Sequence, residues 1–177
     1  LTALFHYHVP QRWSVAHLYQ AMLKKEPHLS KISSLFTLAG YINWQMTGEK
    51  VIGVGEASGM FPIDINTHDD NQEMVDLFDE KAALFGYSFH LRDLLPKTAL
   101  AGNIAGYLTE EGAKRLDISG NLKAGIPIAP AEGDAGTGMT ATNSVAVRTG
   151  NVSAGTSVFG MIVLEQDLKD VHDEIDL

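Results

Sequence analysis

The chain has 177 residues, enough for one ordinary domain or for one domain joined to part of another. Hydrophobic residues make up 45% and charged residues 20% of the sequence, a balance typical of a folded globular protein and not of a disordered one. The lack of cysteine excludes disulfide scaffolds, Cys-bound zinc, iron–sulfur clusters and thiol nucleophiles, and the net charge of −9 argues against a nucleic-acid partner.

Helical periodicity dominates the first half of the chain. Apolar spacing predicts helices over residues 13–26, from Ser33 or Ser34 to Met46, and over residues 71–85. Ser14 is a candidate N-cap, and Gly48 and Gly86 are typical stop signals. The apolar stripe expected to be buried on the second helix is Leu35, Leu38, Ile42 and Met46. Residues 50–54 are predicted to form a short strand.

The second half alternates more often between helix and strand. The sequence predicts, in order, a helical turn at 91–95, a strand and turn at 98–108, a helix capped by Thr109, and a short strand at 124–130. A loop that runs into a helix is predicted over 132–142, and a β-hairpin over 151–164 with its turn at 155–157. The change from helix to hairpin indicates a boundary between residues 143 and 149.

The sequence matches neither of two common nucleotide-binding fingerprints. The pattern G-x-x-x-x-G-K-[ST] does not occur, which excludes a P-loop. Gly53-x-Gly55-x-x-x-Gly59 follows a predicted strand, but it is one residue too long for the dinucleotide pattern. These glycines are therefore predicted to form a turn.

Asp134 stands among small residues, in Gly133-Asp134-Ala135-Gly136, between a predicted strand and a predicted helix. Small neighbours let a ligand approach closely, and a carboxylate placed there can accept the proton of a substrate hydroxyl. The alternative is that Asp134 only caps the helix that follows it. The local sequence by itself favours the cap.

Gly155-Thr156-Ser157 is a second turn of small residues, between two strands. Its backbone N–H groups and hydroxyls are suited to hold phosphate oxygens. The alternative, an ordinary hairpin turn, is favoured when the turn is considered alone.

No metal site and no membrane segment are expected. The acidic stretch of residues 69–80 lacks the spacing of a calcium loop, and the histidines are scattered. Apolar runs are short and interrupted, so no membrane partner is expected and the cytoplasm is the expected location.

Several segments together resemble the first domain of FGGY carbohydrate kinases, with xylulokinase-like pentulose kinases the most similar. The segments are 12–18 (RWSVAHL), 38–49 (LAGYINWQMTGE), 56–59 (EASG), 106–109 (GYLT), 122–128 (LKAGIPI), 132–136 (EGDAG) and 153–157 (SAGTS). Their order and spacing agree across nearly the whole chain.

This resemblance implies an α/β fold of the actin-like ATPase (ribonuclease H-like) type, in which two domains face each other across a cleft. Residues 1–143 would be the later part of the N-terminal sugar-binding domain. Residues 144–177 would begin the C-terminal nucleotide-binding domain with its opening β-hairpin. The chain is therefore expected to be an internal fragment of a longer kinase, and inactive by itself.

The resemblance also implies roles for individual residues. Asp134 matches the general base, Arg12 and Ala135 match positions that contact the sugar, and Gly155 and Thr156 match a turn that contacts the nucleotide phosphates. The implied substrates are ATP and a sugar such as xylulose, with Mg²⁺ as cofactor, and a homodimer is a possible assembly. His17 and Gln20 depart from the family pattern, which leaves a non-catalytic sugar-binding or regulatory relative as the alternative.

Overall fold

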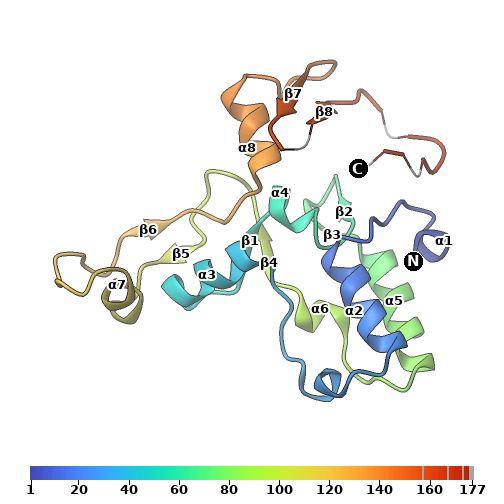
Figure 1. Ribbon diagram of the computed structural model, residues 1–177, viewed down its shortest axis with the longest axis horizontal. Helices are drawn as coiled ribbons and strands as arrows, with labels where there is room; N and C mark the ends of the chain where they lie inside the picture. Colours follow the sequence, from blue (N-terminus) through green and yellow to red (C-terminus); the bar gives the residue numbers. More distant parts are fainter. Residues whose placement is uncertain (157, 167, 173, 176–177) are drawn as a thin grey trace.

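Helices alternate with short strands in the computed structural model, which describes residues 1–156, 158–166, 168–172 and 174–175 (Figure 1). The helices are α1 (Thr2–Phe5), α2 (Ser14–Leu23), α3 (Leu38–Thr47), α4 (Val54–Ala57), α5 (Gln72–Leu84), α6 (Leu91–Leu94), α7 (Glu110–Leu116) and α8 (Asp134–Ala141), with a 3₁₀ helix over Pro27–Lys31. The strands are β1 (Val51–Gly53), β2 (Ile63–Asp64), β3 (Asp69–Asp70), β4 (Lys97–Ala99), β5 (Gly106–Tyr107), β6 (Pro127–Ile128), β7 (Gly150–Ala154) and β8 (Val158–Ile162).

The strands pair two by two among the described residues. β1 and β4 are parallel, with Ile52 opposite Thr98, whereas β2–β3, β5–β6 and β7–β8 are antiparallel. The parallel pair joins segments on either side of α4 and α5, as a parallel connection requires a long crossover. The predicted hairpin is confirmed in β7 and β8, although Ser157 of its turn lies outside the described residues.

The main core lies between α2, α5 and the segment after α4 (Figure 1). Its largest fully buried side chains include Phe61, Phe78, Met22 and Ile52. Phe5 packs edge-on against Phe61, with ring centroids 5.6 Å apart. The helix predicted over 71–85 is confirmed as α5, which buries its apolar face here.

Local capping chemistry sets the ends of several helices. Asn71 caps α5 by accepting a hydrogen bond from Met74 N–H at 3.1 Å, and Thr109 caps α7 in the same way from Gly112 N–H at 2.9 Å. Gly48 ends α3 with a φ of 76°, which glycine adopts without strain. The expectation for Ser14 is wrong: Trp13 is the N-cap of α2, and no side chain caps this helix.

The second predicted helix is correct in its end and wrong in its start and its buried face. Residues 32–37 are not helical, because Leu35 N–H donates to Leu94 C=O at 2.7 Å, and α3 begins at Leu38 after the Thr37 cap. Leu38 is 75% exposed and Ile42 47% exposed, so the expected apolar stripe does not face a core. The buried residues of α3 are Gly40, Asn43 and Thr47.

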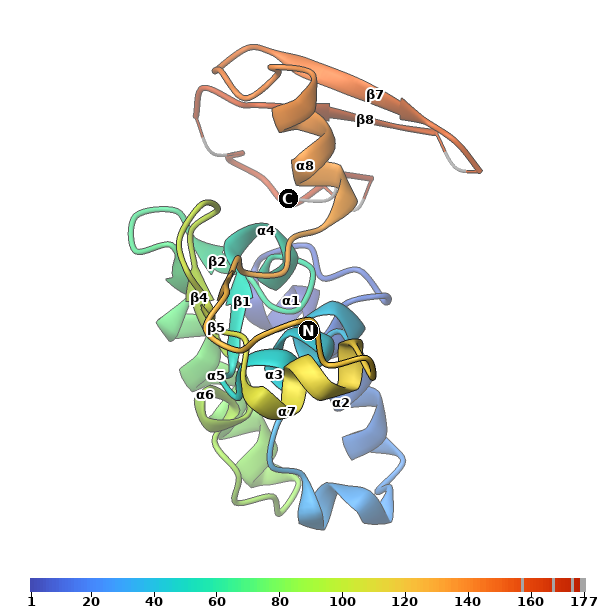
Figure 2. The same ribbon diagram turned by 90° about the vertical axis from the view of Figure 1, so that its left-hand side faces the viewer.

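An arm built from α7, β5 and β6 packs on α3 (Figure 2). Thr109 Oγ1 donates to Met46 C=O at 3.0 Å, and Arg115 donates to the side chain of Gln45. Gly112 makes the approach possible, because a Cβ at that position would lie 2.4 Å from Met46 C=O. The closeness of the two helices therefore depends on the missing side chain.

Substituting Gly112→Ala is expected to destabilise the protein by about 1–3 kcal/mol, because the added methyl group must push α7 away from the backbone of α3. Chemical unfolding measures the change. Gly136→Ala is the matched control, since a Cβ on Gly136 in α8 meets no neighbouring atom. That control is expected to stabilise the protein, by at most about 1 kcal/mol. Equal effects of the two substitutions would contradict the close contact.

Arg92 in α6 forms ion pairs with the β2–β3 hairpin. Arg92 pairs with Asp69 through Nη2 at 2.7 Å, and its Nη1 pairs with Asp70. The side chain of Asp70 is only 3% exposed. Burial raises the pKa of Asp70 to about 6 against the opposing attraction of Arg92, whereas the hydrogen bonds and charge of Arg92 outweigh burial and lower the pKa of Asp69.

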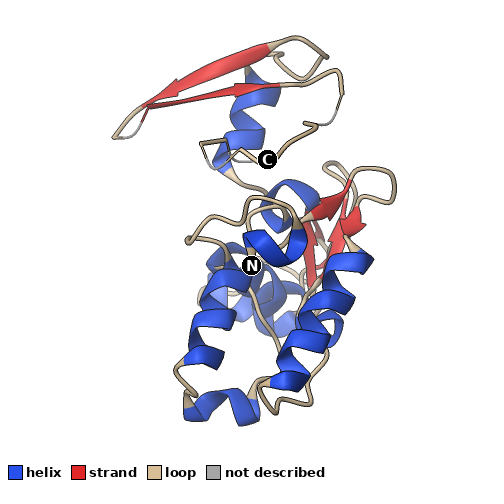
Figure 3. Ribbon diagram, turned by 90° about the vertical axis from the view of Figure 1, so that its right-hand side faces the viewer, coloured by secondary structure: helices blue, strands red, loops and turns tan. Residues whose placement is uncertain are grey.

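The segment from α8 to β8 projects from one end of this body (Figures 1 and 3). β7 packs on α8, where Asn151 Nδ2 donates to Thr142 Oγ1 at 3.3 Å. Of the described helices, none has the length and apolar character needed to cross a membrane.

Candidate functional site

The segment that leads into α8 crosses α3 and the end of β1, and hydrogen bonds hold it there. Asn43 Nδ2 in α3 donates to Ala129 C=O at 2.9 Å, and Gly53 N–H at the end of β1 donates to Ala131 C=O at 2.8 Å. Asn43 is nearly fully buried, so loss of this bond would leave a polar group without a partner. The approach to Asp134 is thus fixed by elements that lie about 80 residues earlier in the chain.

Glu132 reaches back from this segment over the start of α4. A Cβ on Gly53 would lie 2.2 Å from the Glu132 carboxylate carbon, and one on Gly55 would lie 2.6 Å from Glu132 Oε2. The predicted turn is wrong at Gly53 and Gly55, because the short helix α4 follows β1 directly, and it is confirmed at Gly59, which lies in the turn after α4. Gly53 and Gly55 leave space for Glu132, which the sequence reasoning did not identify as a site residue.

The surroundings of Glu132 shift the pKa of its carboxyl in opposite directions. Burial raises the pKa of its carboxyl, the backbone N–H groups of Glu56 and Gly55 lower it by hydrogen bonding, and the negative charge of Glu56 raises it further. Glu56 also approaches the segment, since a Cβ on Gly133 would lie 3.2 Å from its Oε2. Two carboxylates therefore flank the residue that precedes Asp134.

Asp134 is the first residue of α8, and its side chain is exposed. The expectation that it caps the helix is wrong, because Gly133 is the N-cap and no side chain caps α8. A carboxylate in the first turn still interacts favourably with the helix dipole. Its position leaves the carboxylate accessible to a hydroxyl group from solvent or from a ligand. Ala135, the next residue, is half-buried.

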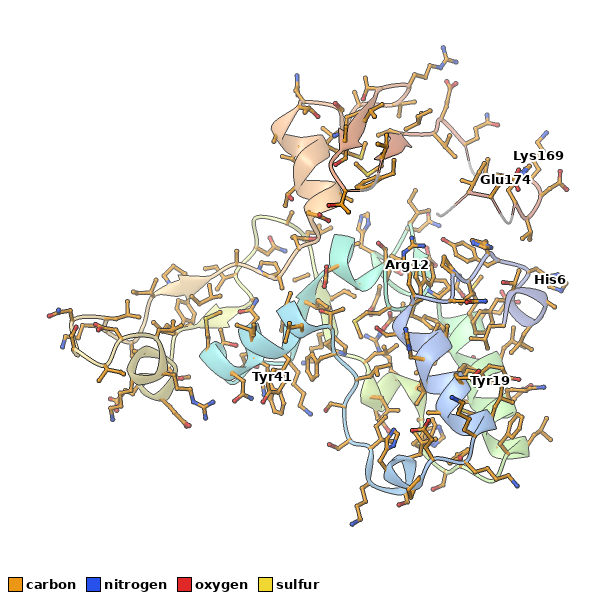
Figure 4. All side chains as sticks on the ribbon, viewed as in Figure 1. His6, Arg12, Tyr19, Tyr41, Lys169 and Glu174 are labelled. Carbon is orange, nitrogen blue, oxygen red and sulfur yellow. The ribbon has the colours of Figure 1, made fainter. Side chains whose placement is uncertain are left out.

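Arg12 lies just before α2 and is exposed (Figure 4). The start of α2 is joined to the end of the α4 segment, because Val15 N–H donates to Met60 C=O at 3.0 Å. α4 therefore connects the parts of the chain that carry Arg12 and Asp134, one at each of its ends.

Gly155 and Thr156 form part of the exposed tip of the β7–β8 hairpin. Figures 2 and 3 show this tip projecting away from the start of α8. The packing of β7 on α8 links the turn to Asp134 through one helix. The structure thus connects the two predicted sites without placing them side by side.

A cavity of about 860 Å³ lies elsewhere, between the N-terminal segment, the turn after β2 and residues 163–166 and 168–172. Its polar lining includes His6, His8, Asp64, Asn66 and His172. Arg12, Asp134, Ala135, Gly155 and Thr156 do not line it. The candidate site is the region where the segment that leads to Asp134 meets the β1–α4 junction, and the hairpin turn with Gly155 and Thr156 lies apart from it.

Comparisons with known proteins bear on the fold. No protein-family model matches the sequence, and no curated protein matches it significantly. A xylulose kinase from Rhodospirillum rubrum shares the structure with a TM-score of 0.70 and 19% identity, over 93% of this chain and 31% of that one. The chain has the fold of part of a xylulose kinase.

A second solved structure, described as a xyloylose kinase from Brucella ovis, agrees with a TM-score of 0.68 at 18% identity, over 89% of this chain and 30% of that one. The resemblance to carbohydrate kinases that the sequence motifs indicate is thus confirmed in the fold, and the α/β architecture matches that of sugar-kinase structures. The chain spans about a third of the length of these xylulose kinase structures.

Proposed function

We propose that this chain belongs to an ATP-dependent FGGY carbohydrate kinase that phosphorylates a hydroxyl group of a ketopentose such as xylulose, or of a related polyol. The observation that carries the proposal is the match of nearly the whole chain to xylulose kinase structures. In this proposal residues 1–143 belong to the sugar-binding domain and residues 144–177 begin the nucleotide-binding domain of an actin-like ATPase fold.

The proposed reaction assigns one task to each site residue. Asp134 accepts the proton of the sugar hydroxyl as its oxygen attacks the γ-phosphorus of ATP, and ADP leaves. The guanidinium of Arg12 donates hydrogen bonds to sugar oxygens, and Ala135 contacts the sugar. Backbone N–H groups at Gly155 and the hydroxyl of Thr156 bind phosphate oxygens. The side chains of Arg12, Asp134 and Thr156 are all exposed, which supports this assignment.

Mg²⁺ would be bound mainly by ATP. Among the described residues, no group of three or more His, Asp or Glu side chains is arranged to hold a metal ion. Mg²⁺ usually takes one or two carboxylates together with substrate phosphates, so in this proposal the ion arrives with the nucleotide. When bound, Mg²⁺ neutralises charge that develops on the phosphates. We assign no residue of this chain as its ligand.

The direct test uses the natural protein that contains this sequence. ADP formation is measured with a panel of ketopentoses and polyols, and a ketopentose is expected to raise the rate well above the rate without sugar. Calorimetric sugar binding without ADP formation would instead favour a non-catalytic relative, the reading that His17 and Gln20 suggest. A protein that neither binds nor phosphorylates any of these sugars would refute the proposal.

A further inference from the structure

Glu132 occupies space that two glycines leave open. Gly53 ends β1 and Gly55 lies in α4, and a side chain on either would overlap the Glu132 carboxylate. Gly55 has a backbone conformation that alanine adopts without strain, because its φ is not positive. Local backbone geometry therefore does not require glycine at position 55, whereas the approach of Glu132 does.

The Glu132 carboxylate lies against the backbone of the β1–α4 junction, where Cβ atoms on Gly53 and Gly55 would be 2.2 Å and 2.6 Å from its atoms. Hydrogen bonding by the backbone N–H groups of Glu56 and Gly55 lowers the pKa of this carboxyl against the effect of burial. Hydrogen bonds from N–H groups to a carboxylate are stronger than those between neutral groups. Since Glu132 is half-buried, these bonds also replace solvent that the carboxylate has lost.

Glu132, which makes this contact with the β1–α4 junction, lies two residues before Asp134 in the chain. Ala131 C=O is bound by Gly53 N–H, the Glu132 side chain is bound at α4, and Gly133 is the extended N-cap from which α8 starts. Gly133 itself has no side chain that could hold the start of α8. The direction in which Asp134 leaves the body of the protein therefore depends on the two residues before Gly133.

We infer that Glu132 is a positioning residue for Asp134: its carboxylate ties the start of α8 to the β1–α4 junction and so fixes the place of the proton-accepting carboxylate. The inference rests on the proposed function of Asp134 as general base. It adds a residue that contacts neither sugar nor nucleotide. Misplacement of a reacting group by about 1 Å can cost about 100-fold in rate.

The first test is Glu132→Ala in the natural protein that contains this sequence. We expect kcat for sugar phosphorylation to fall about 10- to 100-fold, with the KM for ATP changed less than about twofold, because the nucleotide is bound elsewhere. Glu132→Gln keeps one acceptor oxygen and is expected to retain more activity than Glu132→Ala. Glu110→Ala, an exposed residue in the first turn of α7, is the matched control and should leave kcat unchanged.

A second variant tests the contact from its other side. Gly55→Ala displaces the Glu132 carboxylate, so it is expected to lower kcat to a similar extent in the otherwise natural protein. In the Glu132→Ala background the same methyl group meets no carboxylate, and the added loss should be less than about twofold. Independent, multiplying losses would show that Gly55 acts for another reason and would overturn the inference.

The dependence on Asp134 is tested in an Asp134→Asn background. If Glu132 acts only through that carboxylate, Glu132→Ala should lower the residual kcat less than about twofold there. An undiminished loss would overturn the positioning role.

Amide hydrogen exchange at Gly55 and Glu56 provides a readout that does not depend on activity, because Glu132→Ala should speed exchange at both amides. Faster exchange in a protein without sugar kinase activity would refute the proposed function alone; unchanged exchange would refute the contact.

Discussion

Asp134→Asn is expected to lower kcat for sugar phosphorylation by about 10²–10⁴-fold, because an amide of nearly the same shape cannot accept the proton of the hydroxyl. The fold should survive. Asp134 is exposed and does not cap α8, so the loss of stability is limited to its interaction with the helix dipole, about 0.5 kcal/mol. Steady-state kinetics with the preferred sugar and chemical unfolding measure the two effects separately.

Asp93→Asn is the matched control for this substitution. Asp93 is an exposed carboxylate in the first turn of α6, remote in sequence from the segments assigned to substrate. It should show the small change in stability without the change in kcat. A turnover close to that of the unsubstituted protein in Asp134→Asn, with the fold intact, would show that Asp134 is not the base.

Arg92→Ala is expected to destabilise the protein by about 3–5 kcal/mol at pH 8, because it leaves the buried carboxylate of Asp70 charged and without its cation. The cost should be clearly smaller at pH 5. Burial already raises the pKa of Asp70 to about 6 with Arg92 present, and loss of Arg92 removes the attraction that opposes this rise. Near pH 5 Asp70 is then protonated, and only the pair with Asp69 is lost.

The direction of the pH effect follows from proton linkage. A carboxyl group whose pKa is higher in the folded than in the unfolded state favours folding at low pH, and that contribution is lost as the pH rises through about 6. Asp69, with a lowered pKa, acts in the opposite direction at more acidic pH. Urea unfolding at both pH values checks the result, and Arg115→Ala, which breaks an exposed pair with Glu111 and an exposed hydrogen bond to Gln45, should cost about 1 kcal/mol at either pH. An equal loss at pH 5 and pH 8 for Arg92→Ala would contradict the assigned role of Asp70.

Several features that depend only on neighbouring residues could be predicted from the sequence. The cap at Thr109, the stop at Gly86 and the hairpin of β7 and β8 each depend on residues within a few positions, and the structure confirms all three. The start of α3 could not be predicted in this way. Residues 32–37 have helical spacing, but the bond from Leu35 to Leu94 keeps that segment out of the helix.

The buried face of α3 shows the same limit. Periodicity favours the apolar stripe that contains Leu38 and Ile42, yet the helix buries Gly40 and Asn43. Gly40 allows close approach to Ile52, since a Cβ there would lie 3.2 Å from its Cδ1, and Asn43 bonds Ala129, 86 residues away. A local sequence pattern cannot predict contacts between residues so far apart in the chain.

The sequence alone determined the longer helices, the β7–β8 hairpin, the candidate carboxylate at Asp134 and the resemblance to carbohydrate kinases, because caps, periodicity and motif order are properties of neighbouring residues. The tertiary structure decided which face of α3 is buried, why Gly53 and Gly55 carry no side chain, and that Asp134 begins α8 without capping it. The first two depend on Ala129 and Glu132 meeting residues about 80 positions earlier in the chain. Only the folded chain brings those groups into contact.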